Sequence, residues 1–458
     1  MELKDKLVLV AGAGISGIGA VGLLKTAGAQ VILYDGNAAF SEDVLYEKMR
    51  VACVQDLDHV EIVLGELLEE VVEDIDLCVV SPGIPMDAAC MKIILSKNKP
   101  VWGEIELAYH CSKGRVIGIT GTNGKTTTTA LTGQIMADYF ESTFVVGNIG
   151  TPYTLMAGRT RKASVTTAEI SSFQLETIHD FHPVISAVLN ITPDHLDRHK
   201  TMECYINTKL SITRNQMEND VCVLNYEDKV LRERSRELKC KVVFFSSRTK
   251  LENGIYMDEN RNIYLAENGR DKYLMNTKEM KLVGTHNAEN VMAAIAIAEA
   301  AKIPDDIYLK TIRAFDAIEH RIEYVAEINN VIYYNDSKGT NTDASKKALE
   351  AMERKTVLIA GGYDKNSEYD DWVNAFGDKI KCLVLLGATK DKIAQAAENH
   401  GFTNIKKVGT LKEAVEISAK EAESGEAVLL SPACASWDMF KSYEERGKLF
   451  KQYVKDLS

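Results

Sequence analysis

The chain of 458 residues is 45% apolar and 26% charged, enough for several packed domains of ordinary size. Its formal net charge of −12 would repel a polyphosphate surface, which argues against nucleic acid as a general partner. No apolar run approaches membrane-spanning length and the first residues carry no secretory pattern, so we expect a cytoplasmic protein without a membrane partner. Nine scattered cysteines without a Cys-x-x-Cys pair predict reduced thiols and no zinc framework.

The opening segment predicts the βαβ beginning of an α/β domain. A strand, a glycine turn, a helix and a second strand are expected over residues 6–11, 12–17, 18–27 and 31–35. Further apolar runs at 77–80 and around 101 continue the predicted sheet. We place the first domain at residues 1–103.

A second α/β pattern follows, and we place its domain at residues 104–317. Strands are expected over 116–120, 143–146, 164–167 and 184–190, and a helix over 287–301. A polar stretch over 241–280 carries short alternating runs separated by turns, which predicts a small β-meander at the side of the domain.

The remaining residues, 318–458, predict a third α/β domain. Its expected strands lie at 331–335, 356–360, 382–386 and 427–430, with a helix over 411–423 and a terminal helix. The fold class is therefore α/β with three domains.

The strongest local signal is a glycine-rich run between a predicted strand and a predicted helix, Gly118-Ile-Thr-Gly-Thr-Asn-Gly-Lys-Thr126. Backbone amides of such a loop cradle phosphate, the lysine adds positive charge and the threonine hydroxyl reaches Mg²⁺. The match to a Walker A motif is not strict, because its first glycine would fall at Ile119. A plain glycine turn is the alternative, which the complete Gly-Lys-Thr ending disfavours. We expect ATP or another nucleoside triphosphate here.

An N-terminal run, Gly12-Ala-Gly-Ile-Ser-Gly17, precedes Asp35 at the end of the second strand and matches a dinucleotide fingerprint. Alone it would suggest NAD. Because a second nucleotide loop lies downstream, we favour a UDP-type diphosphate at this first loop.

Two further stretches supply acid and imidazole groups of the kind used in magnesium chemistry. Glu169 ends one predicted strand, and the cluster Asp194-His-Leu-Asp-Arg-His199 follows another. Each could instead be a solvated helix cap, and histidine is an uncommon Mg²⁺ ligand. The local sequence alone predicts that Lys209 lies at the surface.

Strand ends in the third domain also gather polar side chains. His320-Arg321 and the run Asn335-Asp-Ser-Lys-Gly-Thr-Asn341 offer groups that bind phosphate and carboxylate, although a polar loop with an Asx turn is the alternative. A second run, Ser431-Pro-Ala-Cys-Ala-Ser-Trp-Asp438, follows a buried strand, and this position favours a ligand site over a plain turn.

In their order along nearly the whole chain, these segments resemble the muramyl ligase family. The resemblance rests on G-T-N-G-K-T, G-N-I-G, E-I-S-S-F-Q-L-E, D-H-L-D-R-H, H-N-x-x-N, H-R, N-D-S-K-G-T-N and L-S-P-A-C-A-S-W-D. It implies a Rossmann-like UDP-binding domain, a central P-loop ATPase-type domain and a C-terminal dinucleotide-fold domain that binds the amino acid.

The resemblance also implies roles for single residues. Catalysis would use Lys125, Glu169, His195 and Lys209, and two Mg²⁺ sites would draw on Thr126, Glu169, His195 and Lys209 in carbamylated form. ATP would be bound by Gly121, Thr122, Asn123, Gly124, Lys125, Thr126, Thr127, Asn287, Asn290, Arg321, Asp336 and Lys338. The UDP-linked substrate would contact Ile15, Ser16, Asp35, Ser81, Asn148 and His195, and D-glutamate would contact Thr340, Lys365, Ser436 and Tyr443.

The implied activity is ATP-dependent amide formation between D-glutamate and UDP-N-acetylmuramoyl-L-alanine, through an acyl phosphate, by a monomer that serves peptidoglycan precursor synthesis. The Asn335–Asn341 run favours D-glutamate over the amino acids that other members of the family add, or over glutamate addition to a folate. From other classes, a nucleotide-dependent switch and an NAD oxidoreductase remain as alternatives.

Overall fold

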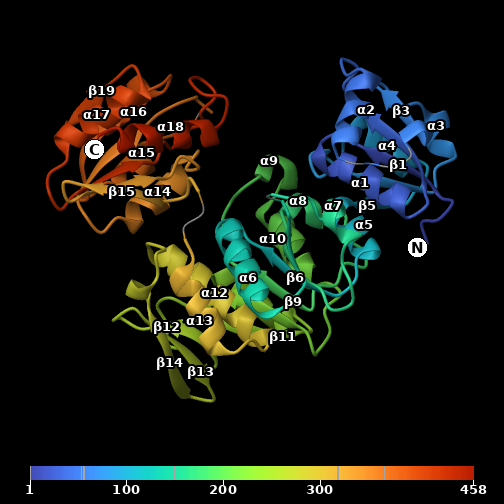
Figure 1. The fold of residues 1–458 in the computed structure, drawn as a ribbon, viewed down its shortest axis with the longest axis horizontal. Coiled ribbons are helices and arrows are strands. Elements are labelled where there is room, and N and C mark those ends of the chain that lie inside the picture. The colour runs from blue at the N-terminus through green and yellow to red at the C-terminus, as the bar shows by residue number, and fades with distance from the viewer. Residues whose placement is uncertain are drawn as a thin grey trace. The chain divides into compact units, whose positions relative to one another are not determined.

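The computed structural model describes residues 2–52, 54, 57–148, 150–316, 319–365 and 367–457. Its contacts divide the chain into two units, one of Met1–Thr277 with Glu289–Ile312 and one of Lys278–Ala288 with Arg313–Ser458. The described residues form a five-stranded and a nine-stranded sheet in the first unit and a six-stranded sheet in the second (Figure 1).

Each of the three predicted domains contains one of these sheets. The boundary placed between residues 103 and 104 stays a prediction. The one between residues 317 and 318 lies outside the described residues.

The five-stranded sheet is wholly parallel, in the order β3-β2-β1-β4-β5. Alternate side chains of β1 enter two different cores, Val8 and Val10 on the face covered by α1, Leu9 and Ala11 on the face covered by α4. Burial on both faces explains why the strands are almost wholly apolar. The strands are β1 Leu7–Ala11, β2 Gln30–Asp35, β3 Val60–Leu64, β4 Leu77–Val80 and β5 Val101–Gly103, and the helices are α1 Ile15–Thr26, α2 Glu42–Val51, α3 Glu69–Glu73, α4 Ala89–Ser96 and α5 Glu104–Cys111.

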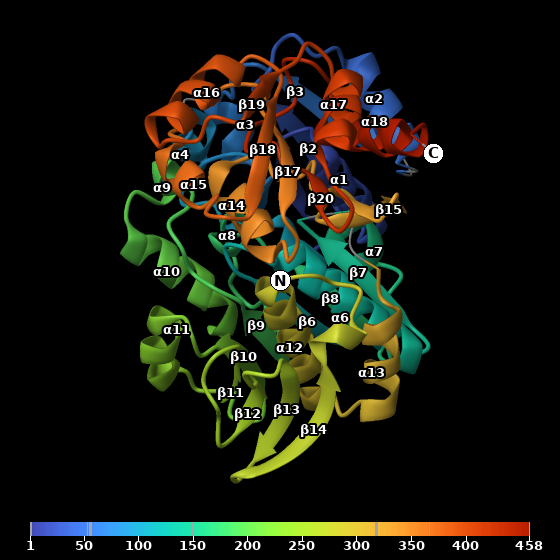
Figure 2. The same cartoon turned by 90° about the vertical axis from the view of Figure 1, so that its left-hand side faces the viewer.

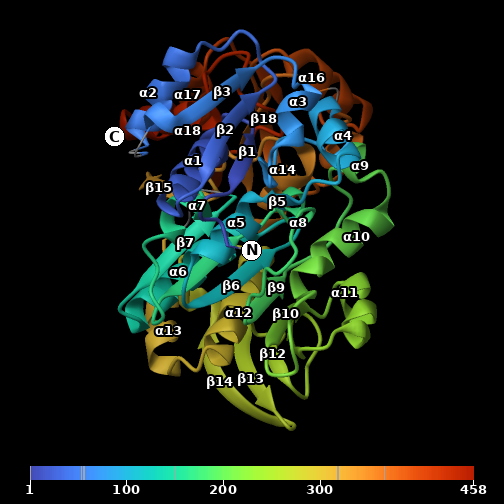
Figure 3. The same ribbon diagram turned by 90° about the vertical axis from the view of Figure 1, so that its right-hand side faces the viewer.

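The nine-stranded sheet has the order β14-β13-β12-β11-β10-β9-β6-β8-β7 (Figure 2), and Figure 3 shows it from the opposite side. Its strands from β12 to β7 are parallel, whereas β13 and β14 are antiparallel additions at one edge. The predicted meander is therefore present but continues the main sheet, because β12 pairs directly with β11. The strands are β6 Arg115–Thr120, β7 Thr143–Gly147, β8 Val165–Glu169, β9 Ile185–Val188, β10 Val221–Asn225, β11 Lys241–Ser246, β12 Gly254–Met257, β13 Asn262–Glu267 and β14 Arg270–Asn276.

Most helices associated with the nine-stranded sheet are short, and α6 and α12 are the long ones. Short α8 is stabilised by a capping box, in which Ser171 and Gln174 each satisfy the other's backbone amide. The helices are α6 Lys125–Tyr139, α7 Tyr153–Ala157, α8 Ser172–Leu175, α9 Leu196–His199, α10 Met202–Leu210, α11 Lys229–Arg234, α12 Thr285–Ala300 and α13 Asp305–Ala314. No helix among the described residues is long and apolar enough to cross a membrane.

The six-stranded sheet of the second unit has the order β15-β16-β20-β17-β18-β19, with β15 as its antiparallel edge. Helices α14, α15 and α16 cover one face of this sheet, and α17 and α18 cover the other (Figure 2). Leu358 and Leu383 pack on the first face, and Val357 and Val384 on the second. The strands are β15 Glu323–Ile328, β16 Val331–Asn335, β17 Thr356–Ala360, β18 Ile380–Leu385, β19 Ile405–Lys407 and β20 Ala427–Leu430, and the helices are α14 Thr342–Ala351, α15 Asp370–Asn374, α16 Lys390–Asn399, α17 Leu411–Glu421 and α18 Tyr443–Lys455.

A buried carboxylate joins the two sheets of the first unit. Glu106 lies in α5, directly after the last strand of the five-stranded sheet, and its side chain is fully buried. It accepts hydrogen bonds from the backbone amides of His179 at 2.8 Å, Asp180 at 2.7 Å and Phe181 at 3.1 Å. The Nε2 atom of His110 lies 3.1 Å from the same carboxylate. These bonds fix α5 to the segment that leads into β9.

Replacing Glu106 with alanine should destabilise the protein by about 2–4 kcal/mol, because three buried amides would lose their acceptor. The measurement is urea denaturation, compared with Glu47→Ala, which removes an exposed carboxylate that pairs with Arg50. The control should stay within about 0.5 kcal/mol of wild type. Equal effects of the two substitutions would show that Glu106 does not fix the junction.

Candidate active site

The glycine-rich run forms a loop between β6, which ends at Thr120, and α6, which begins at Lys125. Gly124 has a φ of +85°, and a Cβ added to it would lie 2.3 Å from Oδ1 of Asn290, so only glycine fits there. The ammonium of Lys125 donates to the carbonyls of Gly121 at 2.9 Å and Thr122 at 3.0 Å. The loop thus presents the amino end of a helix together with a lysine, the arrangement that binds phosphate.

Asn190, just beyond β9, holds this loop and was not singled out from the sequence. Its side chain accepts from the Asn123 amide at 2.8 Å and donates to the Asn123 carbonyl at 3.1 Å, and its own carbonyl accepts from the Thr122 amide at 2.9 Å. The Thr122 hydroxyl accepts from the Thr192 amide at 3.0 Å. In the sequence, Asn190 could have been found as an asparagine at the carboxyl end of a buried strand, the position where ligand-site residues gather.

Glu169 lies at the same edge of the sheet. It ends β8, pairs in register with Ile119 of β6, and is 2% exposed. The Asn148 side chain donates to it at 3.0 Å, and the Asn148 amide donates to its carbonyl at 2.8 Å. The structure therefore brings the predicted residues Glu169 and Asn148 together. They lie beside β6, the strand that leads into the phosphate-binding loop.

Lys209 is buried and not at the surface, contrary to what its local sequence suggested. Its side chain in α10 is 1% exposed and donates to the carbonyl of Gly121 at 2.9 Å. Burial, with the positive charge of Lys125 as a second cause, lowers the pKa of the Lys209 ammonium to about 7. A substantial fraction of this amine is thus neutral near physiological pH, at the base of the phosphate-binding loop.

His195 precedes α9 and adopts the left-handed conformation, with a φ of +51°. Its half-exposed ring lies 4.8 Å from that of Phe173, and its Nε2 atom lies 3.4 Å from the Asp194 carboxylate. Thr126, in the first turn of α6, is partly exposed, and Thr127 behind it is buried. A carboxylate and a hydroxyl beside a phosphate-binding loop are hard oxygen donors, so the residues present fit a magnesium ion.

The N-terminal loop is held by Asp35, whose two carboxylate oxygens accept from the amides of Ala13 at 2.8 Å and Asn37 at 2.9 Å. Ser81, directly after β4, donates to the carbonyl of Gly12 at 3.3 Å. Ile15 is 74% exposed and begins α1, with Ser16 next to it. The predicted residues Ile15, Ser16, Asp35 and Ser81 therefore surround one loop at the carboxyl end of the first sheet.

In the second unit, Arg321 lies between two residues with left-handed backbone, His320 with a φ of +68° and Ile322 with a φ of +43°. A β-branched residue such as Ile322 is strained there, and such strain gathers at functional sites. Asp336 accepts from the Ile322 amide and, at 2.7 Å, from the Ser431 hydroxyl. Burial raises the pKa of the Asp336 carboxyl to about 7.

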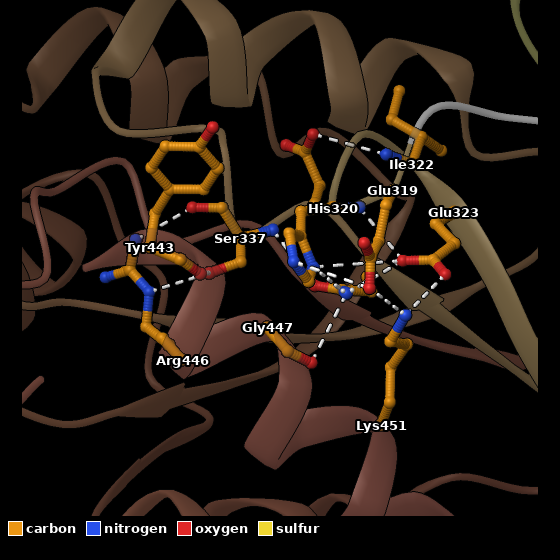
Figure 4. Close-up of polar contacts among 11 residues, drawn as sticks. Glu319, His320, Ile322, Glu323, Ser337, Tyr443, Arg446, Gly447 and Lys451 are labelled. Atoms are coloured by element: carbon orange, nitrogen blue, oxygen red, sulfur yellow. Dashed lines mark hydrogen bonds and ion pairs between the residues drawn. The ribbon is translucent and has the colours of Figure 1, made fainter. Parts of the chain in front are cut away.

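The segment around His320 is anchored to α18 (Figure 4). The Asn335 side chain donates to the His320 ring at 2.9 Å, and Lys451 pairs with Glu319 at 2.7 Å and Glu323 at 2.9 Å. The carbonyl of His320 accepts from the amide of Lys338, whose ammonium lies 5.7 Å from the centre of the Tyr443 ring.

Arg446 organises the loop after β20 and was also missed from the sequence. Its fully buried guanidinium donates to the hydroxyl and carbonyl of Ser337 and to the carbonyls of Cys434 and Ala435. These bonds fix the backbone directly before Ser436, which is buried.

Of the other residues predicted for this unit, Lys365 lies with its ammonium 5.2 Å from the centre of the exposed Trp437 ring. The Thr340 amide bonds to the carbonyl of Lys338 at 2.8 Å. Asn287 is buried and donates to the carbonyl of Val283 at 2.8 Å. In the first unit, Asn290 accepts from the Thr128 hydroxyl at 3.3 Å, behind the phosphate-binding loop.

A glycine loop that joins a central parallel strand to a helix, flanked by a buried carboxylate and a buried lysine, defines a nucleotide-binding α/β enzyme. Family models match in the same order as the three sheets: "Mur ligase MurD-like, N-terminal domain" over residues 6–103, "Mur ligase middle domain" over 119–298 and "Mur ligase, glutamate ligase domain" over 320–434. The chain therefore belongs to the Mur ligase family of ligases, as its motifs suggested.

Relatives named UDP-N-acetylmuramoylalanine--D-glutamate ligase are similar over the full chain. The protein from Lachnospira eligens is 54% identical with all of both chains covered, and that from Lachnoclostridium phytofermentans is 52% identical over 100% of this chain and 99% of its own. Among solved structures, UDP-N-acetylmuramate-alanine ligase MurC from Thermotoga maritima has a TM-score of 0.61 at 17% identity, covering 99% of this chain and 100% of that one. This last likeness shows the fold alone, and it confirms the predicted fold class.

The buried ammonium of Lys209 predicts a pH-dependent stability. Its pKa in the folded protein, about 7, lies below its usual value of 10.5, so between these values the unfolded chain binds the proton more tightly. The free energy of unfolding should therefore rise with pH through this window. Relative to Lys209→Met, wild type should gain on the order of several kcal/mol between pH 7 and pH 10.

The measurement is urea denaturation of both proteins in carbonate-free buffer at several pH values. Lys250→Met serves as the control, because Lys250 is exposed and paired with Asp271. A difference between wild type and Lys209→Met that does not change with pH would show that Lys209 keeps an ordinary pKa.

Proposed function

We propose that this protein is an ATP-dependent ligase that joins D-glutamate to UDP-N-acetylmuramoyl-L-alanine in peptidoglycan precursor synthesis. The observation that carries the proposal is the phosphate-binding loop with Lys209 buried at its base, where the ammonium donates to the carbonyl of Gly121. The full-length similarity to D-glutamate ligases supports the choice of substrates. We also propose that the protein acts as a cytoplasmic monomer.

The reaction must first make a carboxylate electrophilic. The terminal phosphoryl group of ATP passes to the carboxylate of the alanine, which gives an acyl phosphate and ADP. The amine of D-glutamate then attacks the acyl carbon, phosphate leaves, and the amine loses a proton as the amide forms. Exclusion of water from the site protects the acyl phosphate from hydrolysis.

The loop residues Gly121 to Thr127 would hold the ATP phosphates, with Lys125 neutralising charge as it moves between the oxygens. Further ATP contacts are proposed for Asn287, Asn290, Arg321, Asp336 and Lys338. Two magnesium ions, held by Thr126, Glu169, His195 and Lys209, would supply electrostatic stabilisation of the transferred phosphoryl group.

The remaining proposed contacts belong to the other two substrates. Ile15, Ser16, Asp35, Ser81, Asn148 and His195 would bind the UDP-linked substrate. Thr340, Lys365, Ser436 and Tyr443 would bind D-glutamate. Both sets lie at the carboxyl ends of parallel strands or at the helices that follow them, where ligands of α/β sheets bind.

We propose that Lys209 is carbamylated in the active enzyme. A neutral amine adds to carbon dioxide and loses a proton, which gives a carbamate, and a pKa of about 7 makes the neutral amine available. The product is a carboxylate, a hard oxygen ligand of the kind Mg²⁺ prefers. It would lie beside the carbonyl of Gly121, to which the ammonium donates in the unmodified chain.

Carbamylation predicts a carbamate carbon signal in the ¹³C spectrum of the protein equilibrated with ¹³C-bicarbonate at pH 8. The signal should be absent in Lys209→Ala and retained in Lys250→Ala. A wild-type spectrum without the signal would contradict the modification, and persistence of the signal in Lys209→Ala would assign it to another amine.

Phosphate release tests the reaction itself. Purified protein with ATP, Mg²⁺ and UDP-N-acetylmuramoyl-L-alanine should release phosphate with D-glutamate and not with L-glutamate, glycine or L-lysine. Lys125→Ala should reduce the rate on the order of 10²–10³-fold, since it removes a charge that stabilises the transition state. Lys250→Ala, at the exposed meander, should match wild type.

Release with a different amino acid would keep the ligase class and reject D-glutamate as the substrate. Release without any amino acid or UDP-linked substrate would favour a nucleotide-dependent switch.

A further inference from the structure

Arg198, in α9, forms an unusually complete set of hydrogen bonds for an arginine outside the proposed catalytic set. Its side chain is 13% exposed. The Nε atom lies 3.1 and 3.2 Å from the two carboxylate oxygens of Glu176, and Nη2 lies 2.6 Å from one of them. Nη1 donates to the carbonyl of Pro82 at 2.8 Å, and Nη2 donates to the carbonyl of Ile84 at 3.2 Å. One guanidinium thus bridges two separate segments of the first unit.

The first segment is the turn that follows β4. Its amide at Ile84 donates to the carbonyl of Ser81 at 3.0 Å, so Arg198 binds the far side of a turn that begins at Ser81. Ser81 in turn donates to the carbonyl of Gly12 in the N-terminal glycine loop. A guanidinium that fixes Pro82 and Ile84 therefore also limits where Ser81 and Gly83 can lie.

Arg198 also contacts an aromatic ring beside His195. The guanidinium of Arg198 lies 4.1 Å from the centre of the Phe173 ring, and the same ring lies 4.8 Å from that of His195 and 5.8 Å from that of His199. His199 is itself buried and bonds through Nε2 to the hydroxyl of Ser172 at 2.9 Å. His195 thus packs on an aromatic ring that Arg198 also covers.

The turn after β4 and α9 both contribute to the lining of one cavity. A cavity of about 1040 Å³ is lined by Gly83 and Pro85 on one side and by Phe173, Glu176 and Arg198 on the other. No residue of the phosphate-binding loop lies among the residues that line it. From α9, the planar guanidinium of Arg198 reaches the turn after β4 with directed hydrogen bonds to the carbonyls of Pro82 and Ile84.

A structural ion pair with Glu176 is the simpler explanation of Arg198. That pair, however, accounts for only one side of the guanidinium. The bonds to two carbonyls of the turn after β4 require its planar fork, whose geometry an ammonium cannot reproduce.

We propose that Arg198 is a positioning residue for the UDP-linked substrate: it fixes the turn at Ser81 and the ring of His195 in one geometry, so that both meet the same ligand. The inference rests on the proposed function, in which Ser81 and His195 contact that substrate. The phosphate-binding loop is held instead by Asn190 and Lys209. Loss of the planar guanidinium should therefore weaken binding of the UDP-linked substrate far more than binding of ATP, most of whose proposed contacts lie in the phosphate-binding loop.

The test uses Arg198→Lys, which keeps the charge and removes the fork. Direct binding of UDP-N-acetylmuramoyl-L-alanine and of a non-hydrolysable ATP analogue is measured by calorimetry, beside the KM of each substrate. We expect the affinity for the UDP-linked substrate to fall about tenfold, the loss of one or two directed bonds, with ATP affinity within twofold of wild type. Glu176→Gln, which keeps the side-chain length, should show the same selectivity to a lesser degree.

Arg214→Lys is the matched control. Arg214 lines the same cavity and donates to the carbonyl of Ile178 at 2.8 Å, and among the described residues it forms no hydrogen bond with the turn after β4. It should bind both ligands like wild type.

The inference is overturned if Arg198→Lys binds the UDP-linked substrate like wild type, if it loses ATP affinity equally, or if Arg214→Lys shows the same loss. If Arg198→Lys does not fold, Glu176→Gln decides by the same criteria. Wild-type protein that binds ATP but not the UDP-linked substrate would overturn the proposed function as well, which separates the two failures.

Discussion

The shape of the phosphate-binding loop depends on hydrogen bonds from residues that lie outside it in the sequence. Asn190 pairs with both backbone groups of Asn123, and Lys209 donates to the carbonyl of Gly121. Because β9 and β8 both pair with β6, the residues just beyond them lie beside the loop without further adjustment. The parallel sheet is thus the scaffold that brings these distant parts of the sequence together.

Buried ionic groups recur where the chain must hold irregular backbone. Glu106 accepts from three consecutive amides, and Arg446 donates to the carbonyls of Ser337, Cys434 and Ala435. A charge that is fully hydrogen-bonded fixes such backbone more sharply than apolar packing, because removing it leaves several buried groups unsatisfied. These residues are distinct from the groups proposed to touch substrates.

The sequence predicted the α/β class, most strands of the sheets and the phosphate-binding loop, because apolar runs and glycine spacing are local signals. It did not predict β15 or the continuation of the main sheet into β12–β14, since strand pairing is decided by tertiary contacts. Lys209 looked exposed because its burial comes from packing against the loop, and not from its own helix. Asn190 and Arg446 were missed, and Arg198 was given no role within the predicted Asp194–His199 cluster, for the same reason: each acts through partners far away in the sequence.

The antiparallel strands also determine how the nine-stranded sheet ends. The outermost strand, β14, begins with Arg270, Asp271 and Lys272, all exposed, and Lys250 pairs with Asp271 across this surface. An uncovered strand edge offers unpaired amides and carbonyls to any passing chain, and charged side chains along it oppose such pairing. The meander therefore protects a large, mostly apolar sheet from growing by addition of another molecule, which would favour solubility at high concentration in the cell.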